Sequence, residues 1–171
     1  MDICSILRCT PVKIVAADYT DPGHAADILR LMEEYAGDPM GGGTSLPREV
    51  AENLVAGLAG FPTAFSLLAV VDEKAVGLVN CFRSLSTFNA RELINIHDLI
   101  VTSAFRGRGV GRALMQAVEE IARQRGCCKL TLEVLEANAV AQQLYRQQGF
   151  DGYALNPTTG RALFWQKLLD Y

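Results

Sequence analysis

The most constraining feature of the sequence is a glycine-rich run that leads directly into a one-sided helix. Apolar residues between positions 110 and 122 recur at intervals of three and four, which is the spacing of one face of an α-helix. These residues are Val110, Ala113, Leu114, Ala117, Val118, Ile121 and Ala122. β-rich runs flank the helix at Ile94–Val101 and Lys129–Leu135. The segment therefore predicts a strand–helix–strand unit with a right-handed crossover.

Further elements are expected on both sides of this unit. Before it we expect a strand at Val12–Tyr19, a helix capped by Asp21, a helix at Arg48–Leu58, and a hairpin of Ala64–Val71 with Ala75–Phe82. Ser84–Leu93 reads as a polar connection, and after the unit we expect a helix at Asn138–Gln148 and strands near Tyr153–Leu155 and Ala162–Leu168. The order β-α-α-β-β-β-α-β-α-β-β predicts an α/β fold with a mixed sheet. Residues 1–11 are interpreted as an N-terminal tail and residues 12–171 as a single domain.

Composition excludes several classes of function. The net charge of −3 argues against a surface that coats nucleic acid. No apolar stretch approaches the roughly 20 residues that span a bilayer, so no membrane association is expected. The five cysteines are odd in number and form no C-x-x-C pair, and only two histidines could join them, so we expect no metal site. Reduced thiols in a cytoplasmic protein are the simpler interpretation.

The run from Arg106 to Gly111 can bind an anion. Glycine lets backbone N–H groups approach a phosphate without obstruction by a Cβ atom, and a helix start adds free donors and a positive dipole end. Arg106, Arg108 and Arg112 add positive charge. The spacing G-x-G-x-G differs from the Rossmann fingerprint, and no lysine follows as a P-loop requires. A glycine turn without a ligand is the remaining structural alternative.

Two motifs resemble those of the GNAT family of N-acetyltransferases. The pyrophosphate-loop pattern Gln/Arg-x-x-Gly-x-Gly/Ala is matched by Arg106, Gly109 and Gly111. The second motif follows one helix and one strand later and comprises Leu132-Glu133-Val134, Asn138, Ala141, Leu144-Tyr145 and Gly149-Phe150. The resemblance implies a GNAT-like fold and acetyl-CoA as the acyl donor, with no metal. It also implies a set of cofactor-binding residues: Leu99, Ile100, Val101, Arg106, Gly107, Arg108, Gly109, Val110, Gly111, Arg112, Asn138, Ala141 and Tyr145.

Acyl transfer to an amine requires a base for the amine, stabilisation of the oxyanion and an acid for the departing thiolate. The resemblance implies that Tyr145 is the acid, since the tyrosine of this Leu-Tyr pair points at the cofactor sulfur in the family. Glu133 is the leading candidate for the base, because it interrupts an apolar strand and its Leu-Glu-Val run resembles that of the ribosomal-protein alanine acetyltransferases. Alternatively, Tyr145 packs on the sheet and Glu133 is a solvent-facing residue.

His97 and Asp98 compete for the role of base. We expect successive side chains of a strand to point to opposite faces, so at most one of the two should face the site. Histidine can accept a proton near neutral pH, and a hydrogen-bonded core histidine is the alternative. The Ile96–Val101 run resembles that of the spermidine/spermine acetyltransferases, but an acidic residue stands there in place of His97.

The acceptor is the least defined part of the prediction. The resemblance implies an acceptor pocket built from Tyr35–Leu46, with the Asn80–Leu85 strand end as a further candidate. Glu33, Glu34 and Asp38 either attract a cationic amine or are simply solvated. The sequence thus predicts an acetyl-CoA-dependent transferase that acts on a primary amine of a small molecule or peptide. It is also compatible with a homodimer. The alternative is a non-catalytic acyl-CoA-binding domain of the same fold.

Overall fold

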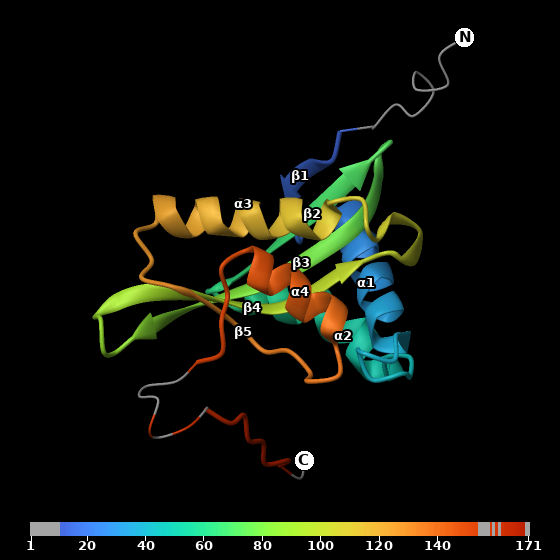
Figure 1. Cartoon of the computed structure of the whole chain (residues 1–171). Helices are drawn as coiled ribbons and strands as arrows, with labels where there is room; N and C mark the ends of the chain where they lie inside the picture. The colour runs from blue at the N-terminus through green and yellow to red at the C-terminus, as the bar shows by residue number, and fades with distance from the viewer. Residues whose placement is uncertain (1–10, 154–157, 159, 161, 170–171) are drawn as a thin grey trace.

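Five strands form one sheet in the computed structural model, which describes residues 11–153, 158, 160 and 162–169. The strands are β1 (Lys13–Ala16), β2 (Ala64–Val71), β3 (Lys74–Ser86), β4 (Arg91–Val101) and β5 (Leu130–Leu132). They lie in the order β1-β2-β3-β4-β5 (Figure 1). All neighbours pair antiparallel except β4 and β5, which are parallel. The mixed sheet predicted from the sequence is confirmed.

Four helices accompany the sheet in the described ranges: α1 (Pro22–Gly37), α2 (Arg48–Gly60), α3 (Val110–Gln124) and α4 (Ala139–Gln147). α1 begins as predicted, because Asp21 accepts a hydrogen bond of 2.9 Å from the backbone of His24 and Pro22 occupies the first turn. A short 3₁₀ helix, Ser103–Phe105, links β4 to the glycine-rich turn before α3. α3 is therefore the crossover between two parallel strands.

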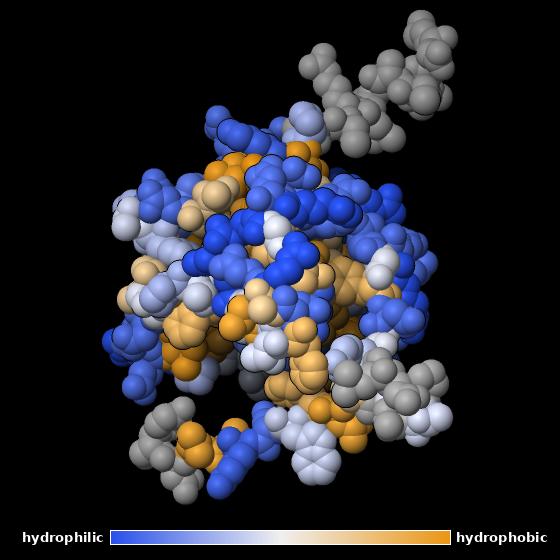
Figure 2. All heavy atoms as spheres, turned by 90° about the vertical axis from the view of Figure 1, so that its left-hand side faces the viewer, coloured by the Kyte–Doolittle hydropathy of each residue, from blue (hydrophilic) through white to orange (hydrophobic). Residues whose placement is uncertain are grey.

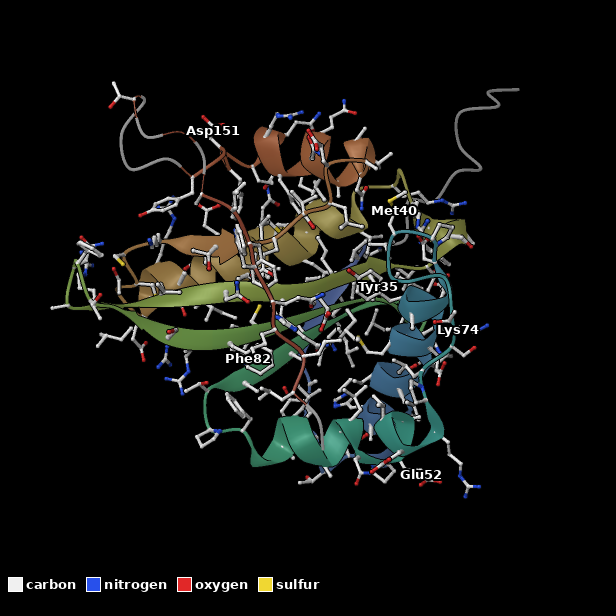
Figure 3. The ribbon with its side chains drawn as sticks, turned by 90° about the horizontal axis from the view of Figure 1, so that it is seen from below. Tyr35, Met40, Glu52, Lys74, Phe82 and Asp151 are labelled. Carbon is white, nitrogen blue, oxygen red and sulfur yellow. The ribbon has the colours of Figure 1, made fainter. Side chains whose placement is uncertain are left out.

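The sheet separates two hydrophobic layers, which Figure 3 shows from below. α3 covers one face, where Leu114 and Val118 are fully buried against side chains of β2, β3 and β4. α1 and α2 cover the other face, and there Ile28, Leu31 and Leu58 pack on Leu68, Leu78 and Ile100. Alternate residues of the central strands therefore enter different layers. We call these the α3 face and the α1/α2 face.

Two predicted features differ from the structure. The polar segment Ser84–Leu93 is largely strand, because β3 runs to Ser86 and β4 begins at Arg91 around a tight turn. Its side chains are polar because both strands extend beyond the covering helices there. Ala162–Leu168 carries no regular structure, and Tyr153–Leu155 lies partly outside the described residues. One backbone hydrogen bond of 3.1 Å, from Ala162 N–H to the carbonyl of Tyr153, joins these two segments.

The C-terminal segment displays large apolar side chains. Leu163, Phe164, Trp165, Leu168 and Leu169 are all exposed. Figure 2 views the side with the β3–β4 turn, where a mainly hydrophilic surface gives way to hydrophobic residues near the chain's C-terminal part. Among the described residues, no helix has both the length and the apolar character needed to cross a bilayer. The same residues contain no group of three or more potential metal ligands from His, Cys, Asp and Glu.

Candidate active site

The glycine-rich turn presents an open, uncapped helix start. Gly107 and Gly109 adopt φ values of +73° and +85°, which side chains rarely tolerate. Gly109 is the residue that precedes α3, and no side chain caps the helix there. A Cβ atom at Gly107 or Gly109 would meet nothing within 4 Å. The free N–H groups of the first helical turn are therefore accessible to an anion.

Gly111, in contrast, has a packing role. A Cβ atom at this position would lie 3.1 Å from Cδ2 of Leu144, which belongs to α4. The missing side chain therefore lets α4 approach the first turn of α3. Val110 is likewise fully buried in the α3 face, so only its backbone can take part in binding. The glycines of the motif thus divide between an open anion site and a helix contact.

The arginines of the turn have different surroundings. Arg106 is committed within the protein, because its Nε donates to the carbonyl of Val101 and its Nη2 to Oδ2 of Asp38, each at 2.9 Å. Arg108 is exposed, with its guanidinium 5.3 Å from the ring centroid of Phe105. Arg112 is also exposed and donates to Gln147 at 3.3 Å. Arg108 and Arg112 are therefore the arginines that can turn toward a bound phosphate.

One edge of β4 lies open beside this turn. β5 pairs only with Ile94–Ile96, so no strand of the described part of the chain pairs with the stretch from His97 to Val101 on that side. Thr102 N–H donates to Val76 of β3, so the preceding carbonyl, that of Val101, points away from β3. Because the backbone groups of a strand alternate in direction, those of Leu99 also point into this gap. An extended ligand could pair with the open edge.

Tyr145 lies half-buried on α4, against the α3 face of the sheet. Its ring centroid is 6.1 Å from that of Phe150. Burial, and secondarily the Tyr35 phenol, raises the pKa of Tyr145 to about 12. No group in the described part of the chain hydrogen-bonds to its hydroxyl. A protonated and unpaired phenol is thus available to a ligand.

Asn138 and Ala141 form the start of α4. The Asn138 side chain accepts a hydrogen bond of 3.1 Å from Ala141 N–H. An asparagine three residues before its donor is the usual N-cap arrangement. The spacing of these residues in the motif therefore has a local structural cause, whether or not a ligand binds beside them.

Glu133 follows the last residue of β5 and is exposed. The expectation of a carboxylate within an apolar strand is wrong, because β5 ends at Leu132, where its pairing with β4 stops. Its side chain forms no ion pair or hydrogen bond with other described residues. Glu133 therefore matches the alternative in which its side chain faces solvent.

A β-bulge places both His97 and Asp98 on the α1/α2 face, so the expectation that they face opposite ways is wrong. Asn80 pairs with Asp98, whereas the next residue, Cys81, pairs with Ile96, and His97 is the extra residue. The exposed His97 ring meets Phe82 edge-on with 5.3 Å between ring centroids. Asp98 is half-buried and accepts a hydrogen bond of 3.0 Å from Nδ2 of Asn80.

Tyr35 connects Asp98 with Tyr145 electrostatically. Burial, followed by the Asp98 carboxylate, raises the pKa of Tyr35, and Tyr35 in turn contributes to the raised pKa of Tyr145. Figure 3 shows Tyr35 near the end of α1, beside the sheet. The sequence marked Tyr35 only as the start of a predicted acceptor region. Its role between two candidate catalytic groups depends on the packing of α1, which no local pattern reveals.

The acidic residues of the first helix are engaged in local bonds. Glu33 accepts from Leu46 N–H at 3.2 Å and Glu34 from Ser103 N–H at 3.0 Å. The Met40 N–H, and then Arg106, hold the pKa of Asp38 below its usual value. These carboxylates fix the α1–α2 loop and the segment before the glycine turn. They are not a free acidic surface for a cationic amine.

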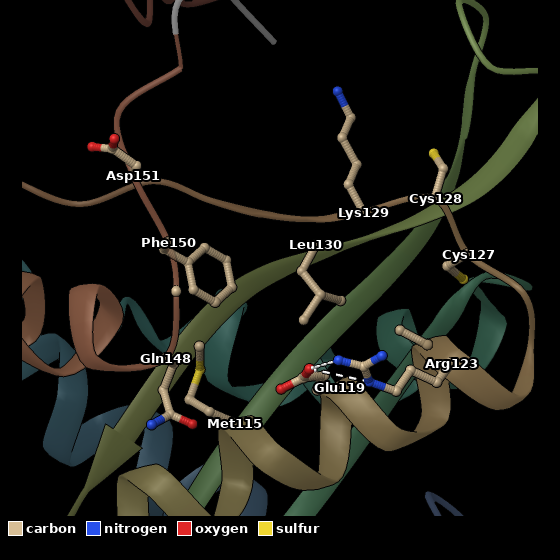
Figure 4. Close-up of a pocket in the computed structure, with 12 residues that line it drawn as sticks. Met115, Glu119, Arg123, Cys127, Cys128, Lys129, Leu130, Gln148, Phe150 and Asp151 are labelled. Atoms are coloured by element: carbon tan, nitrogen blue, oxygen red, sulfur yellow. Dashed lines mark hydrogen bonds and ion pairs between the residues drawn. The ribbon is translucent and has the colours of Figure 1, made fainter.

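Two cavities in the described ranges do not include Tyr145 among the residues that line them. One of about 420 Å³ lies between α3, β5 and the residues after α4, and Glu119 and Arg123 form an ion pair on its wall (Figure 4). The other, of about 390 Å³, includes Arg30, Lys74 and Phe105. Neither contains Asp98 or the glycines of the turn. The candidate active site is therefore the open gap between β4, α3 and α4.

Comparison with known proteins identifies relatives of this arrangement. The sequence matches the profile of the acetyltransferase (GNAT) family over residues 28–150. Streptothricin acetyltransferase of Streptomyces lavendulae is 43% identical over 67 residues, which are 39% of this chain and 34% of the relative. Thialysine N-epsilon-acetyltransferase of Bos taurus is 36% identical over 74 residues, 43% of each protein. The chain thus spans about a third to under half of the length of these relatives.

The fold is shared with solved acetyltransferase structures. The aminoglycoside N-acetyltransferase AAC(6')-Iy, solved in complex with CoA, superimposes with a TM-score of 0.70 at 17% sequence identity. The superposition covers 92% of this chain and 96% of the other. At this identity the likeness concerns the fold alone.

Proposed function

The chain belongs to the GNAT acetyltransferase family, and we propose that it transfers an acetyl group from acetyl-CoA to a primary amine on a small molecule or peptide. Transfer is direct, within a complex that holds donor and acceptor together. The observation that carries the proposal is Tyr145, a half-buried phenol whose pKa is raised to about 12 and whose hydroxyl has no partner in the described part of the chain. It lies on the helix that packs against the first turn of α3 at Gly111.

The residues around the glycine turn fit the donor. Open space at Gly107 and Gly109 and the free N–H groups at the start of α3 suit a pyrophosphate, and Arg108 and Arg112 can add charge. The open edge of β4 at Leu99 suits an amide-containing arm, since the Val101 carbonyl already accepts a hydrogen bond from Arg106. Acetyl-CoA would supply the acetyl group as a thioester. Arg106 acts differently from the phosphate contact that the motif implies, since it anchors the turn to Asp38.

The proposed reaction divides its proton transfers between two side chains. Asp98 accepts the proton of the amine while the nitrogen bonds to the thioester carbonyl carbon. As the C–S bond breaks, the departing sulfur takes the Tyr145 proton. Asp98 is preferred to Glu133 because it is half-buried and within electrostatic reach of Tyr35, while Glu133 is exposed beyond β5. His97, which is exposed and meets Phe82 edge-on, is assigned to the acceptor side.

The acceptor would bind on the α1/α2 face beside Asp98. Phe61, Phe82 and His97 form a continuous row there, with edge-on contacts of 5.4 Å and 5.3 Å between ring centroids. Aromatic rings next to a carboxylate favour an ammonium group carried on an apolar body. Relatives named for streptothricin and for the epsilon nitrogen of thialysine support an amine acceptor.

A thiol-release assay with acetyl-CoA and a panel of primary amines tests this function. We expect turnover with at least one amine, and strong loss of turnover in Tyr145→Phe and Asp98→Asn. Glu136→Gln changes an exposed carboxylate without a side-chain partner in the described residues and serves as the control. CoA binding without turnover of any amine would indicate a binding domain instead of an enzyme.

We also propose a cytoplasmic location. Support comes from Cys81, Cys127 and Cys128, which are unpaired thiols in the described ranges. A homodimer stays a prediction, and light scattering on the purified chain would test it.

A further inference from the structure

Two polar side chains lie in the most buried part of the sheet. Ser66 of β2 and Asn80 of β3 are 2% and 1% exposed, on the α1/α2 face among Leu68, Leu78 and Met32. Burying an amide or hydroxyl in such a layer costs free energy unless every group is hydrogen-bonded. An apolar pair at these positions would stabilise the layer more simply. Their presence therefore points to a task for the hydrogen bonds that they form.

The hydrogen bonds form a chain with a defined direction. Ser66 Oγ donates to Oδ1 of Asn80 at 2.6 Å, so the Tyr19 hydroxyl, 2.9 Å away, must donate to Ser66. Nδ2 of Asn80 donates to Oδ2 of Asp98 at 3.0 Å and to the Met32 sulfur at 3.3 Å. The chain thus runs from the half-buried Tyr19 to the carboxylate of Asp98.

This pattern fixes the orientation of the Asn80 amide. If the amide were reversed, its oxygen would face the Asp98 carboxylate, and two acceptors would meet without a proton between them. Because Asn80 is also directly opposite Asp98 in the sheet register, the bulge at His97 is what brings the carboxylate into line with the amide.

We propose that Tyr19, Ser66 and Asn80 are a positioning chain that holds one oxygen of Asp98, so that its other oxygen faces the acceptor amine as the proton acceptor. The inference rests on the proposed function and adds residues from two further strands to the site. The Asn80 carboxamide does not act as an acid or a base, so the chain orients Asp98 and does not conduct its proton. The proton that Asp98 takes from the amine passes to solvent from the half-exposed side of the carboxyl group.

Other groups that carry a charge or a dissociable proton lie near Asp98. Tyr35 approaches from α1 and Cys81 from β3, and in both the Asp98 carboxylate contributes to a raised pKa. His97 is its neighbour on β4 and has no hydrogen bond to it in the described ranges. Asn80 is therefore the one of these neighbours that donates a hydrogen bond to Asp98 in the described part of the chain, and its removal should favour the protonated carboxyl group.

Ser66→Ala and Asn80→Ala test the chain, and Ser86→Ala is the matched control. Ser86 is also a buried serine, 6% exposed, and its Oγ accepts from Asn89 at the far end of β3. In both test variants we expect kcat to fall about tenfold to hundredfold, since small misplacements of a catalytic group have such effects. The KM for acetyl-CoA should stay unchanged, and the acid limb of the kcat/KM profile should move to higher pH. Ser66→Thr keeps the hydroxyl, so it should retain the activity and the position of the acid limb of the wild type.

A carbon-13 titration of the Asp98 carboxyl group gives a second readout, without substrate. In Ser66→Ala its midpoint should move in the same direction as the acid limb, whereas Ser86→Ala should match the wild type. A purely structural role predicts a lower thermal midpoint with an unmoved acid limb and titration, and that result would overturn the chain. If Asp98→Asn keeps both activity and the acid limb, the base assignment itself fails. If Asn80→Ala does not fold, the comparison of Ser66→Ala with Ser66→Thr still tests the chain.

Discussion

The Tyr145 phenol is protonated over the whole range in which enzymes are normally assayed, because burial raises its pKa to about 12. A raised pKa means that the proton stays bound until the pH approaches that value, so the acid is available at neutral and alkaline pH. Tyr145→Phe should therefore lower kcat by about 100-fold or more. The KM for acetyl-CoA should change little, since the ring and its contact with Phe150 are retained.

Steady-state kinetics from neutral to alkaline pH check this prediction. Wild type and Tyr145→Phe should show the same alkaline shape, with rates offset by a constant factor. An alkaline limb in the wild type that disappears in the variant would mean that Tyr145 titrates far below the expected range. Full activity in the variant would remove Tyr145 from the reaction.

His97 has a different expected role at the residue scale. It is exposed and meets Phe82 edge-on, at the end of the aromatic row that begins with Phe61. His97→Gln should raise the KM for the acceptor several-fold and leave the acid limb of kcat/KM in place, because the proton acceptor is Asp98. The measurement is a pH profile of both parameters for the best acceptor. Loss of the acid limb in this variant would make His97 the base.

At the scale of elements, the contact between α3 and α4 depends on Gly111. A valine there would place atoms against Leu144, whose Cδ2 is 3.1 Å from the position of a Cβ atom. Overpacking of this kind costs about 1–3 kcal/mol of unfolding free energy. Leu144→Ala in the same chain should recover part of the loss, and urea unfolding of the single and double variants measures the coupling.

Gly57→Val is the matched control for this effect. Gly57 also lies within a helix, α2, but a Cβ atom there would meet nothing within 4 Å. The unfolding free energy of Gly57→Val should therefore change only by the small intrinsic difference in helix propensity between glycine and valine. If Gly111→Val were no worse than Gly57→Val, the helix contact would not need the glycine. Of Gly109 and Gly111, Gly109 alone would then have a structural reason to be glycine, namely its positive φ.

The sequence predicted most elements but not the local geometry that decides the site. Periodicity located α3, because burial on one side leaves a regular pattern. The hairpin of β2 and β3 was instead located by two β-rich runs on either side of a turn. The bulge at His97 leaves no such pattern, since an inserted residue changes the phase of the strand without changing its composition. The end of β5 before Glu133 was equally hidden, because the apolar run continues past the last residue that pairs with β4.

The buried polar chain shows a second limit of sequence reasoning. Ser66 and Asn80 lie 14 positions apart and meet only because β2 and β3 pair in one register. Their link to Tyr19 and Asp98 spans four segments of the chain. The glycine motif, in contrast, acts through local backbone conformation at Gly107 and Gly109, and was therefore readable in the sequence.

At the scale of the whole molecule, Glu92 of β4 links β3 to the end of α3, near the turn of the β3–β4 hairpin. Its Oε1 is 3.1 Å from Arg83 of β3, and its Oε2 is 3.1 Å from Arg125, which follows α3. The hydrogen bond from Arg125, followed by the charges of Arg125 and Arg83, holds the pKa of Glu92 below its ordinary value of 4.5. A depressed pKa stabilises the folded state above the unfolded pKa and ceases to do so as the pH falls through the folded one.

Thermal unfolding as a function of pH tests this contribution. Glu92→Gln should unfold at a lower temperature than the wild type at pH 7, and the difference should shrink toward zero as the pH falls below about 4.5, the pKa of a free glutamate. Added salt should reduce the difference at neutral pH, because Arg125 is exposed and Glu92 and Arg83 are partly exposed. Glu136→Gln, whose carboxylate has no partner in the described ranges, should show no such dependence. A difference for Glu92→Gln that persists unchanged into acid would mean that packing of this side chain, and not its charge, holds the hairpin against α3.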